Sequence, residues 1–242
     1  MNEAIVVIGL TKRYDGRAVV DGLNLTVPAG TIFGLLGANG AGKSTSIECM
    51  LGTRRADAGT VHLLGQNPAK NRRALFSRIG VQFQEGDYQQ QIRVSELCEE
   101  TACLYKTPAD WHELLRRFGL GEKEQSEVRS LSGGQRQRLF IVLALIPQPE
   151  LVFLDELTTG LDAKARRKIW RLLSSLRDQG LTILLTSHFM DEVEALCDGI
   201  CILRRGQTVF TGTVAEAKAR CGCDNLEDAY LMLSEDEKGE IA

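Results

Sequence analysis

Residues 31–44 read Thr-Ile-Phe-Gly-Leu-Leu-Gly-Ala-Asn-Gly-Ala-Gly-Lys-Ser, an apolar run that leads straight into a glycine-rich loop. The last eight residues fit the pattern G-x-x-x-x-G-K-[ST], in which glycines let backbone N–H groups turn toward a phosphate. Lys43 supplies a positive charge to the β- and γ-phosphates, and Ser44 supplies an oxygen ligand for Mg²⁺. A helix expected over residues 43–51 adds its partly positive N-terminus. A glycine turn that happens to precede a lysine is the alternative. The position between a buried strand and a helix favours nucleotide binding.

Strands that alternate with helices predict an α/β fold with a mainly parallel core sheet. The short apolar runs at residues 151–154 and 181–185 are typical of strands buried on both faces. Residues 163–179 between these runs predict a helix, which Gly180 ends. Residues 5–27 read instead as short strands with tight turns, and residues 200–210 as a hairpin.

The middle of the chain breaks this alternation. Residues 94–105 and 108–118 each have a helical pattern, and no strand is expected between residues 94 and 130. Thr107 is the expected N-cap of the second helix, with Pro108 at its first position. This stretch therefore predicts a helical insertion in the α/β body.

Composition restricts the class of protein further. The chain has 242 residues, of which 43% are hydrophobic and 25% charged, as in globular proteins. The net charge of −3 disfavours a general nucleic-acid binder. No apolar run is long enough for a membrane span, and the N-terminus lacks the pattern of a signal peptide. We therefore expect a cytosolic protein that reaches a membrane only through a partner.

The seven cysteines agree with a cytosolic location, because an odd, scattered set is not a disulfide framework. Cys221 and Cys223 are the one close pair. We interpret them as small residues near a helix end, with a metal or redox role as the alternative.

Two carboxylates follow the apolar run at residues 151–154. Asp155, at the carboxyl end of a parallel strand, is placed to hold Mg²⁺ beside Ser44. Glu156 is placed to polarise a water molecule that attacks the γ-phosphate. A surface pair that begins the next loop is the alternative, and the phosphate loop upstream favours the catalytic interpretation.

Residues 131–139, Leu-Ser-Gly-Gly-Gln-Arg-Gln-Arg-Leu, resemble the signature sequence of ATP-binding-cassette (ABC) ATPases. Ser132 is expected to cap a helix that runs to about residue 146, and Gly133 and Gly134 expose its first amides as a second anion site. The resemblance covers residues 5–212 and implies a P-loop ABC cassette. It implies one domain over residues 1–242. A β subdomain and core occupy about 1–84 and 150–212, a helical subdomain 85–149, and C-terminal helices with an acidic tail 213–242.

The resemblance also implies roles for single residues. Tyr14 resembles the aromatic that stacks on adenine, although an ordinary turn tyrosine is the alternative. Gln84, rather than the nearby Gln82, resembles the glutamine that reaches Mg²⁺ and the attacking water. His188 resembles the switch histidine at the γ-phosphate, against the alternative of a structural histidine.

The implied sets are as follows: catalytic Glu156, His188 and Gln84; Mg²⁺ ligands Ser44, Gln84 and Asp155; ATP-binding Tyr14, Gly37, Ala38, Asn39, Gly40, Ala41, Gly42, Lys43, Ser44 and Thr45; and, toward the ATP of a partner subunit, Ser132, Gly133, Gly134, Gln135 and Asp162. Leu157 departs from the proline that is commonest in this loop of the family.

In the family, two cassettes sandwich two ATP molecules head to tail, which implies a homodimer or a pair with a paralogous cassette. Residues 11–14, 34–40, 188–198 and 226–231 are similar to cassettes of ABC-2-type exporters, of the drug-resistance, antibiotic-resistance or sodium-export kind. We therefore expect an ATPase with Mg²⁺ that drives separate integral membrane permease subunits from the inner face of the cell membrane. Nucleic acid is not an expected partner.

Residues 85–95 would contact that membrane partner, with a solvated loop as the alternative. A soluble ABC ATPase that energises the assembly of a cytosolic complex, and an importer motor, remain alternative functions. The transported substrate is a property of the membrane subunit.

Overall fold

The computed structural model describes residues 2–82, 88–89, 91–156, 158 and 160–234. In chain order, its strands and helices are β1 (Glu3–Tyr14), β2 (Arg17–Pro28), β3 (Ile32–Leu36), α1 (Lys43–Met50), β4 (Ala58–Leu63), α2 (Arg72–Phe76), β5 (Ile79–Gln82), α3 (Val94–Cys103), α4 (Trp111–Arg117), α5 (Gly133–Leu145), β6 (Leu151–Leu154), α6 (Ala163–Asp178), β7 (Thr182–Leu185), α7 (Met190–Leu196), β8 (Gly199–Arg204), β9 (Gln207–Gly212), α8 (Val214–Cys221) and α9 (Leu226–Ser234). Short 3₁₀ turns occupy Gly121–Lys123 and Val128–Ser130.

The core sheet has the strand order β5-β6-β7-β3-β8-β9. Its neighbours are parallel except for β8 and β9, which form the expected antiparallel hairpin. Every residue of β3, β6 and β7 is buried, because helices and a second sheet cover the two faces. The prediction of an α/β fold with a mainly parallel sheet is confirmed.

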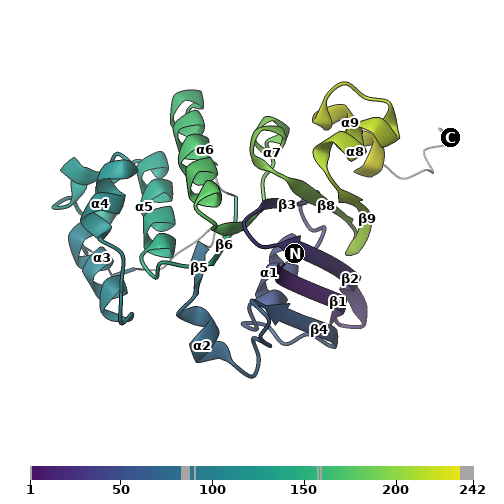
Figure 1. Cartoon of the computed structure of the whole chain (residues 1–242), viewed down its shortest axis with the longest axis horizontal. Helices are drawn as coiled ribbons and strands as arrows, with labels where there is room; N and C mark the ends of the chain where they lie inside the picture. The colour runs from purple at the N-terminus through teal and green to yellow at the C-terminus, as the bar shows by residue number, and fades with distance from the viewer. Residues whose placement is uncertain (1, 83–87, 90, 157, 159, 235–242) are drawn as a thin grey trace.

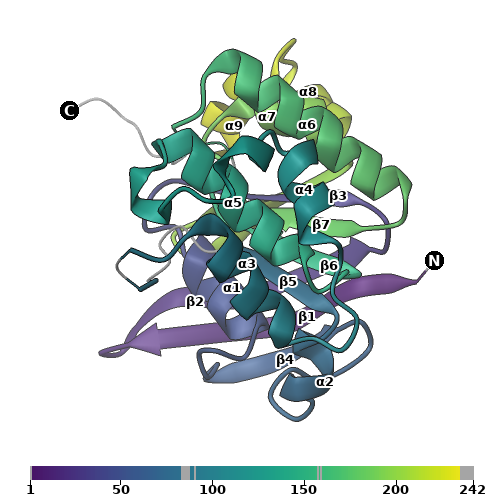
Figure 2. The same cartoon turned by 90° about the vertical axis from the view of Figure 1, so that its left-hand side faces the viewer.

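The core strands send alternate side chains to opposite faces, as the two-residue period of a strand requires. Phe33 and Phe153 join the apolar cluster that includes α1 and the antiparallel sheet. Ile32 and Val152, one position earlier, join the cluster formed with α5 and α6. Figure 2 shows the consequence, with α6 and α7 above the core sheet and the β1–β2–β4 sheet below it. Both faces of the strands that carry the candidate site are thereby held in place.

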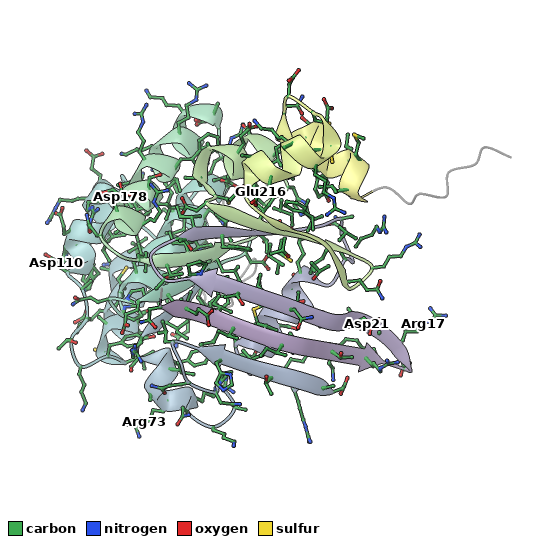
Figure 3. All side chains as sticks on the ribbon, turned by 45° about the vertical axis from the view of Figure 1, so that its right-hand side comes forward. Arg17, Asp21, Arg73, Asp110, Asp178 and Glu216 are labelled. Atoms are coloured by element: carbon green, nitrogen blue, oxygen red, sulfur yellow. The ribbon has the colours of Figure 1, made fainter. Side chains whose placement is uncertain are left out.

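The second sheet has the order β2-β1-β4 and is antiparallel throughout its described strands. Asp15 and Gly16, both with positive φ, form the turn between β1 and β2. Arg17 lies at the outer tip of this hairpin in Figure 3. Asp21 ties the hairpin to the core, since its amide donates to the carbonyl of Gly206 at 2.9 Å and its carboxylate accepts from Gln207 at 2.9 Å. The sequence predicts short strands over residues 5–27, whereas the structure has two strands of 12 residues each, β1 and β2.

Helices α3, α4 and α5 form the helical insertion, on the left of Figure 1. The predicted start of α4 is wrong. The helix begins at Trp111, and its N-cap is Asp110. The carboxylate of Asp110 accepts from the amides of His112 at 2.9 Å and Glu113 at 3.2 Å. Thr107 does not cap the helix, because the amide of Ala109, from which a cap at Thr107 would accept, donates instead to the Ile146 carbonyl at 2.8 Å. The side chain of Asp110 is labelled at the edge of the molecule in Figure 3.

Helix α5 crosses β5 at very close range. A Cβ atom on Gly80 would overlap the carbonyl oxygen of Ala144, near the C-terminal end of α5. A residue with a side chain would force the helix away from the sheet, so glycine is required at this crossing. The contact anchors the helical insertion to the strand that leads toward residues 83–87.

Helices α8 and α9 pack against the β8–β9 edge, on the right of Figure 1. Gly222, with φ of 67°, ends α8 between Cys221 and Cys223, which confirms their position at a helix end. In the described part of the chain, no three His, Cys, Asp or Glu residues are grouped as a metal site would need. None of the described helices combines the length and apolar character that crossing a bilayer demands.

Candidate nucleotide site

The glycine-rich loop connects β3 to α1, the strand–loop–helix context that its sequence predicts. Gly37 and Gly42 have φ of 151° and 100°. A Cβ on either would lie 2.5 Å from a backbone oxygen, that of Leu203 or of Val19. Glycine is therefore required at both positions. The hydrogen bond from the Gly206 amide to the Ala41 carbonyl, at 3.0 Å, fixes the loop against the β8–β9 turn.

Lys43 folds across this loop. Its side chain is 7% exposed, and Nζ donates to the carbonyl oxygens of Gly37 at 2.7 Å and Ala38 at 3.2 Å. Burial lowers the pKa of Lys43, whereas the nearby carboxylates of Asp155 and Glu156 raise it. A cation held by carbonyls of its own loop can transfer the same donors to phosphate oxygens. Residues 38–40 and Ser44 are exposed at the mouth of the loop, and Thr45 is half-buried behind it.

The carboxyl end of β6 brings Asp155 to the same place. Its Oδ2 lies 3.5 Å from the hydroxyl of Ser44, and its Oδ1 accepts from the hydroxyl of Thr186 at 2.5 Å. The same Thr186 oxygen accepts from the amide of Glu156 at 2.9 Å. The hydroxyl and carboxylate of Ser44 and Asp155 are hard oxygen donors of the kind that Mg²⁺ binds. The third predicted ligand, Gln84, lies outside the described residues.

Sequence reasoning did not single out Thr186. A signal for it was present, because Thr186 follows the strand next to the one that ends at Asp155. Carboxyl ends of neighbouring parallel strands meet at one edge of the sheet. Its hydroxyl is fully buried and links the two carboxylate-bearing residues.

Glu156 and His188 are brought together across the ends of β6 and β7. Glu156 Oε1 lies 3.1 Å from His188 Nε2, with side-chain exposures of 19% and 36%. Glu156 has a φ of 52°, an uncommon left-handed conformation for a residue with a side chain. Its carbonyl accepts from Gln137 of α5 at 3.1 Å. The backbone at Glu156 is thus held from α5 as well as from Thr186.

Ser132 caps α5, as its sequence predicts. Its hydroxyl accepts from the Gln135 amide at 3.3 Å, and the Gln135 side chain accepts from the Ser132 amide at 2.9 Å. Both side chains therefore already serve a capping box in the single chain. Gly134 packs under the next loop, since a Cβ on it would lie 2.7 Å from Leu161 Cδ2. Asp162 caps α6 by accepting from the Ala165 amide at 2.8 Å.

Tyr14 lies at the end of β1 and is 38% exposed. Lys12 Nζ and the guanidinium of Arg54 are each 5.4 Å from its ring centroid. Gln82, the glutamine that we set aside, is buried at the end of β5. Leu157 lies outside the described residues, as does Thr159.

Comparison with known proteins adds to this geometry. The family described as "ABC transporter" matches residues 20–159. The chain is 41% identical to Nod factor export ATP-binding protein I of Ralstonia nicotianae over 90% of this chain and 70% of that protein. It is 36% identical to daunorubicin/doxorubicin resistance ATP-binding protein DrrA of Streptomyces peucetius over 92% of this chain and 69% of that protein. A solved ATP-binding subunit of an ABC transporter superposes with a TM-score of 0.88 and 26% identity, over 96% of this chain and 100% of that chain.

Proposed function

Because this chain belongs to the ABC transporter family, as an ATP-binding subunit, we propose that it hydrolyses Mg²⁺–ATP to drive an exporter. Export is supported by the names of the relatives, which are a Nod factor export protein and a daunorubicin/doxorubicin resistance protein. These relatives do not favour the alternative of a soluble ATPase in a cytosolic complex. Hydrolysis is supported above all by the 3.1 Å contact of Glu156 with His188 beside the phosphate loop.

Different residues of the site would bind the phosphates, the Mg²⁺ ion and the adenine. Amides of residues 37–42 surround the phosphates, and Lys43 exchanges its carbonyl partners for phosphate oxygens. Mg²⁺, when bound, neutralises phosphate charge, and Ser44, Asp155 and Gln84 are the proposed ligands. Tyr14 offers an exposed ring for the adenine.

Glu156 is the proposed base for the attacking water. Its carboxylate can accept a proton from that water, and His188 at 3.1 Å orients the carboxylate and faces the γ-phosphate. Thr186 holds the Glu156 amide, so the carboxylate does not have to be ordered when the nucleotide arrives. The chain thus supplies a base, its orienting partner and a fixed backbone.

The second half of each site is proposed to come from another cassette. Ser132, Gly133, Gly134, Gln135 and Asp162 would face the ATP of the partner subunit, in a homodimer or with a paralogous cassette. Membership of the ABC transporter family supports this arrangement.

The membrane side of the assembly is also a proposal. The helical subdomain, about residues 85–149, would contact an integral membrane permease subunit through residues 85–95. The chain would then lie on the inner face of the cell membrane. Residues 1–84 with 150–212 would form the nucleotide-binding body, and residues 213–242 a C-terminal extension.

Replacing Glu156 by glutamine tests the hydrolysis proposal. The variant should bind ATP as the wild type does and form an ATP-bound dimer. It should release phosphate at least about a hundredfold more slowly, because the amide cannot accept the proton. The matched control is Glu113→Gln, at an exposed carboxylate of α4 that pairs with Arg116. Undiminished phosphate release from Glu156→Gln would exclude the assigned base.

A further inference from the structure

A buried carboxyl group, that of Glu192, lies between the two loops of the candidate site. Glu192 is in the first turn of α7, four residues after His188, and is 0% exposed. Its Oε1 accepts from Trp170 Nε1 of α6 at 2.9 Å. Helix α6 begins at its N-cap Asp162, in the segment that follows Glu156. One hydrogen bond therefore joins the helix after His188 to the helix after Glu156.

The other oxygen of this carboxyl group, Oε2, is buried without a hydrogen-bond partner in the described part of the chain. The hydroxyl of Thr158 is also buried without a hydrogen-bond partner among the described residues, and Thr158 is 1% exposed. Thr158 and Ser187 both face the carboxyl group closely enough to lower its pKa. Thr158 is two residues after Glu156, and Ser187 directly precedes His188. The carboxyl group is thus approached from both catalytic loops.

The surroundings favour a neutral carboxylic acid. Among the ion pairs of the described residues, none includes Glu192. Arg166 of α6 reaches α7, but its guanidinium lies 4.7 Å from the Phe189 ring centroid and its Nη1 lies 3.7 Å from Asp191 Oδ2. Burial raises the pKa of Glu192 and outweighs the hydrogen bonding of Ser187, Trp170 and Thr158, which lowers it; the charge of Asp191 adds a smaller upward shift. A buried carboxylate without a cation is costly, which favours the neutral form of Glu192 more than that of an exposed glutamate.

A proton on Oε2 would supply a donor for the Thr158 hydroxyl. A neutral carboxylic acid has one O–H donor, and the hydroxyl of Thr158 can accept it. Glu192 accepts from Trp170 through Oε1 at 2.9 Å, and in the neutral acid Oε2 would be the donor available to the Thr158 hydroxyl. The Trp170 bond connects α7 to α6, and Thr158 lies in the segment that joins Glu156 to α6.

We propose that Glu192 is a positioning residue that, through its buried hydrogen bond to Trp170, holds the loops of Glu156 and His188 in register. This proposal rests on the proposed hydrolysis at Glu156. Among the described residues, the hydrogen bond of Glu192 is to Trp170 of α6 and not to the phosphate loop, so the proposal predicts an effect on turnover and not on ATP binding.

Two substitutions of Glu192 test whether a neutral side chain of the same shape can replace it. Glu192→Gln keeps the shape, with a carbonyl to accept from Trp170 and an amide to donate to Thr158. It should retain at least about half of the wild-type kcat. Glu192→Ala removes both bonds, so kcat should fall at least about tenfold while the Kd for ATP stays within about twofold. The matched control is Glu194→Ala, at an exposed residue of the same helix that pairs with Lys218 at 2.6 Å, and it should behave as wild type.

A double substitution tests whether Glu192 acts through His188. Under single-turnover conditions, adding Glu192→Ala to His188→Ala should slow phosphate release by less than about twofold. A merely structural role would multiply the two effects and so overturn the proposal. If Glu192→Ala does not fold, Trp170→Phe removes the donor and keeps the ring, and kcat should fall at an unchanged Kd.

Three other results would also overturn the proposal: wild-type turnover by Glu192→Ala, a Glu192→Gln variant as slow as Glu192→Ala, or a loss of ATP affinity at unchanged kcat. If the wild-type chain binds ATP and releases no phosphate, it is the proposed function that fails. The two failures are therefore distinguishable.

Discussion

Thr186→Val removes one hydroxyl from the site and nearly preserves the shape of the side chain. The hydroxyl donates to Asp155 at 2.5 Å and accepts from the Glu156 amide at 2.9 Å, and Thr186 is 0% exposed. A bond to a charged group contributes about 1.5–3 kcal/mol and a neutral bond about 0.5–1.5 kcal/mol. The variant should therefore lose about 2–4.5 kcal/mol of unfolding free energy. It should also turn over ATP at least about tenfold more slowly, because the backbone of Glu156 is released.

Urea unfolding and phosphate release at saturating Mg²⁺–ATP measure the two effects. The control is Thr182→Val at the other end of β7. Thr182 is 1% exposed, and its hydroxyl accepts one bond, from the Gly30 amide at 2.9 Å. That variant should lose about 1 kcal/mol and hydrolyse ATP normally. Equal losses of stability in the two valine variants, with wild-type turnover in both, would refute this account of Thr186.

Mixing chains tests the composite site. Subunits with Lys43→Ala and subunits with Gly134→Asp should each be inactive alone and regain up to about a quarter of wild-type activity when mixed, because half of randomly paired dimers have one complete site of two. A Gly134→Asp chain that dimerises with ATP and hydrolyses it normally would exclude closure by the signature. A second prediction concerns pH. Burial raises the pKa of Glu192 above its ordinary 4.5, and the facing charges are Asp191 and Arg166. The folded chain then binds the extra proton, so wild-type stability relative to Glu192→Gln should fall as pH rises from 4.5, by up to about 1.4 kcal/mol per pH unit. A pH-independent difference in urea midpoints would contradict a neutral Glu192.

The features that the sequence predicts well depend on local patterns. The run at residues 31–36 is apolar at nearly every position, which is sufficient to indicate a strand buried on both faces. Ser132 with Gln135 three residues later is a capping-box pattern, and the structure has that box. The phosphate loop is equally local, because its glycines are required by backbone positions within a few residues.

The features that the sequence does not reveal depend on contacts between distant segments. Thr107 has the sequence of a helix cap, but the Ala109 amide that it would accept from is bonded to the carbonyl of Ile146 at the end of α5, and Asp110 caps instead. Thr186 is separated from Asp155 by 31 residues, and only the order of the strands places them together. No local periodicity contains such information.

Helix α5 crosses β5 at Gly80, close to the C-terminal end of the helix. A rotation of α5 about this crossing, as a pivot, would therefore move its N-terminal end the most. The pivot is at Ala144, and the capped end at Ser132 is twelve residues away, a distance of about 18 Å at 1.5 Å per residue. A rotation of about 10° around this pivot moves the Ser132 end by about 3 Å, which is the length of a hydrogen bond. A rotation of this size would therefore be enough to bring the first amides of α5 within reach of an anion or to withdraw them. The absence of a side chain at Gly80 is what allows this contact between α5 and the sheet to be so close.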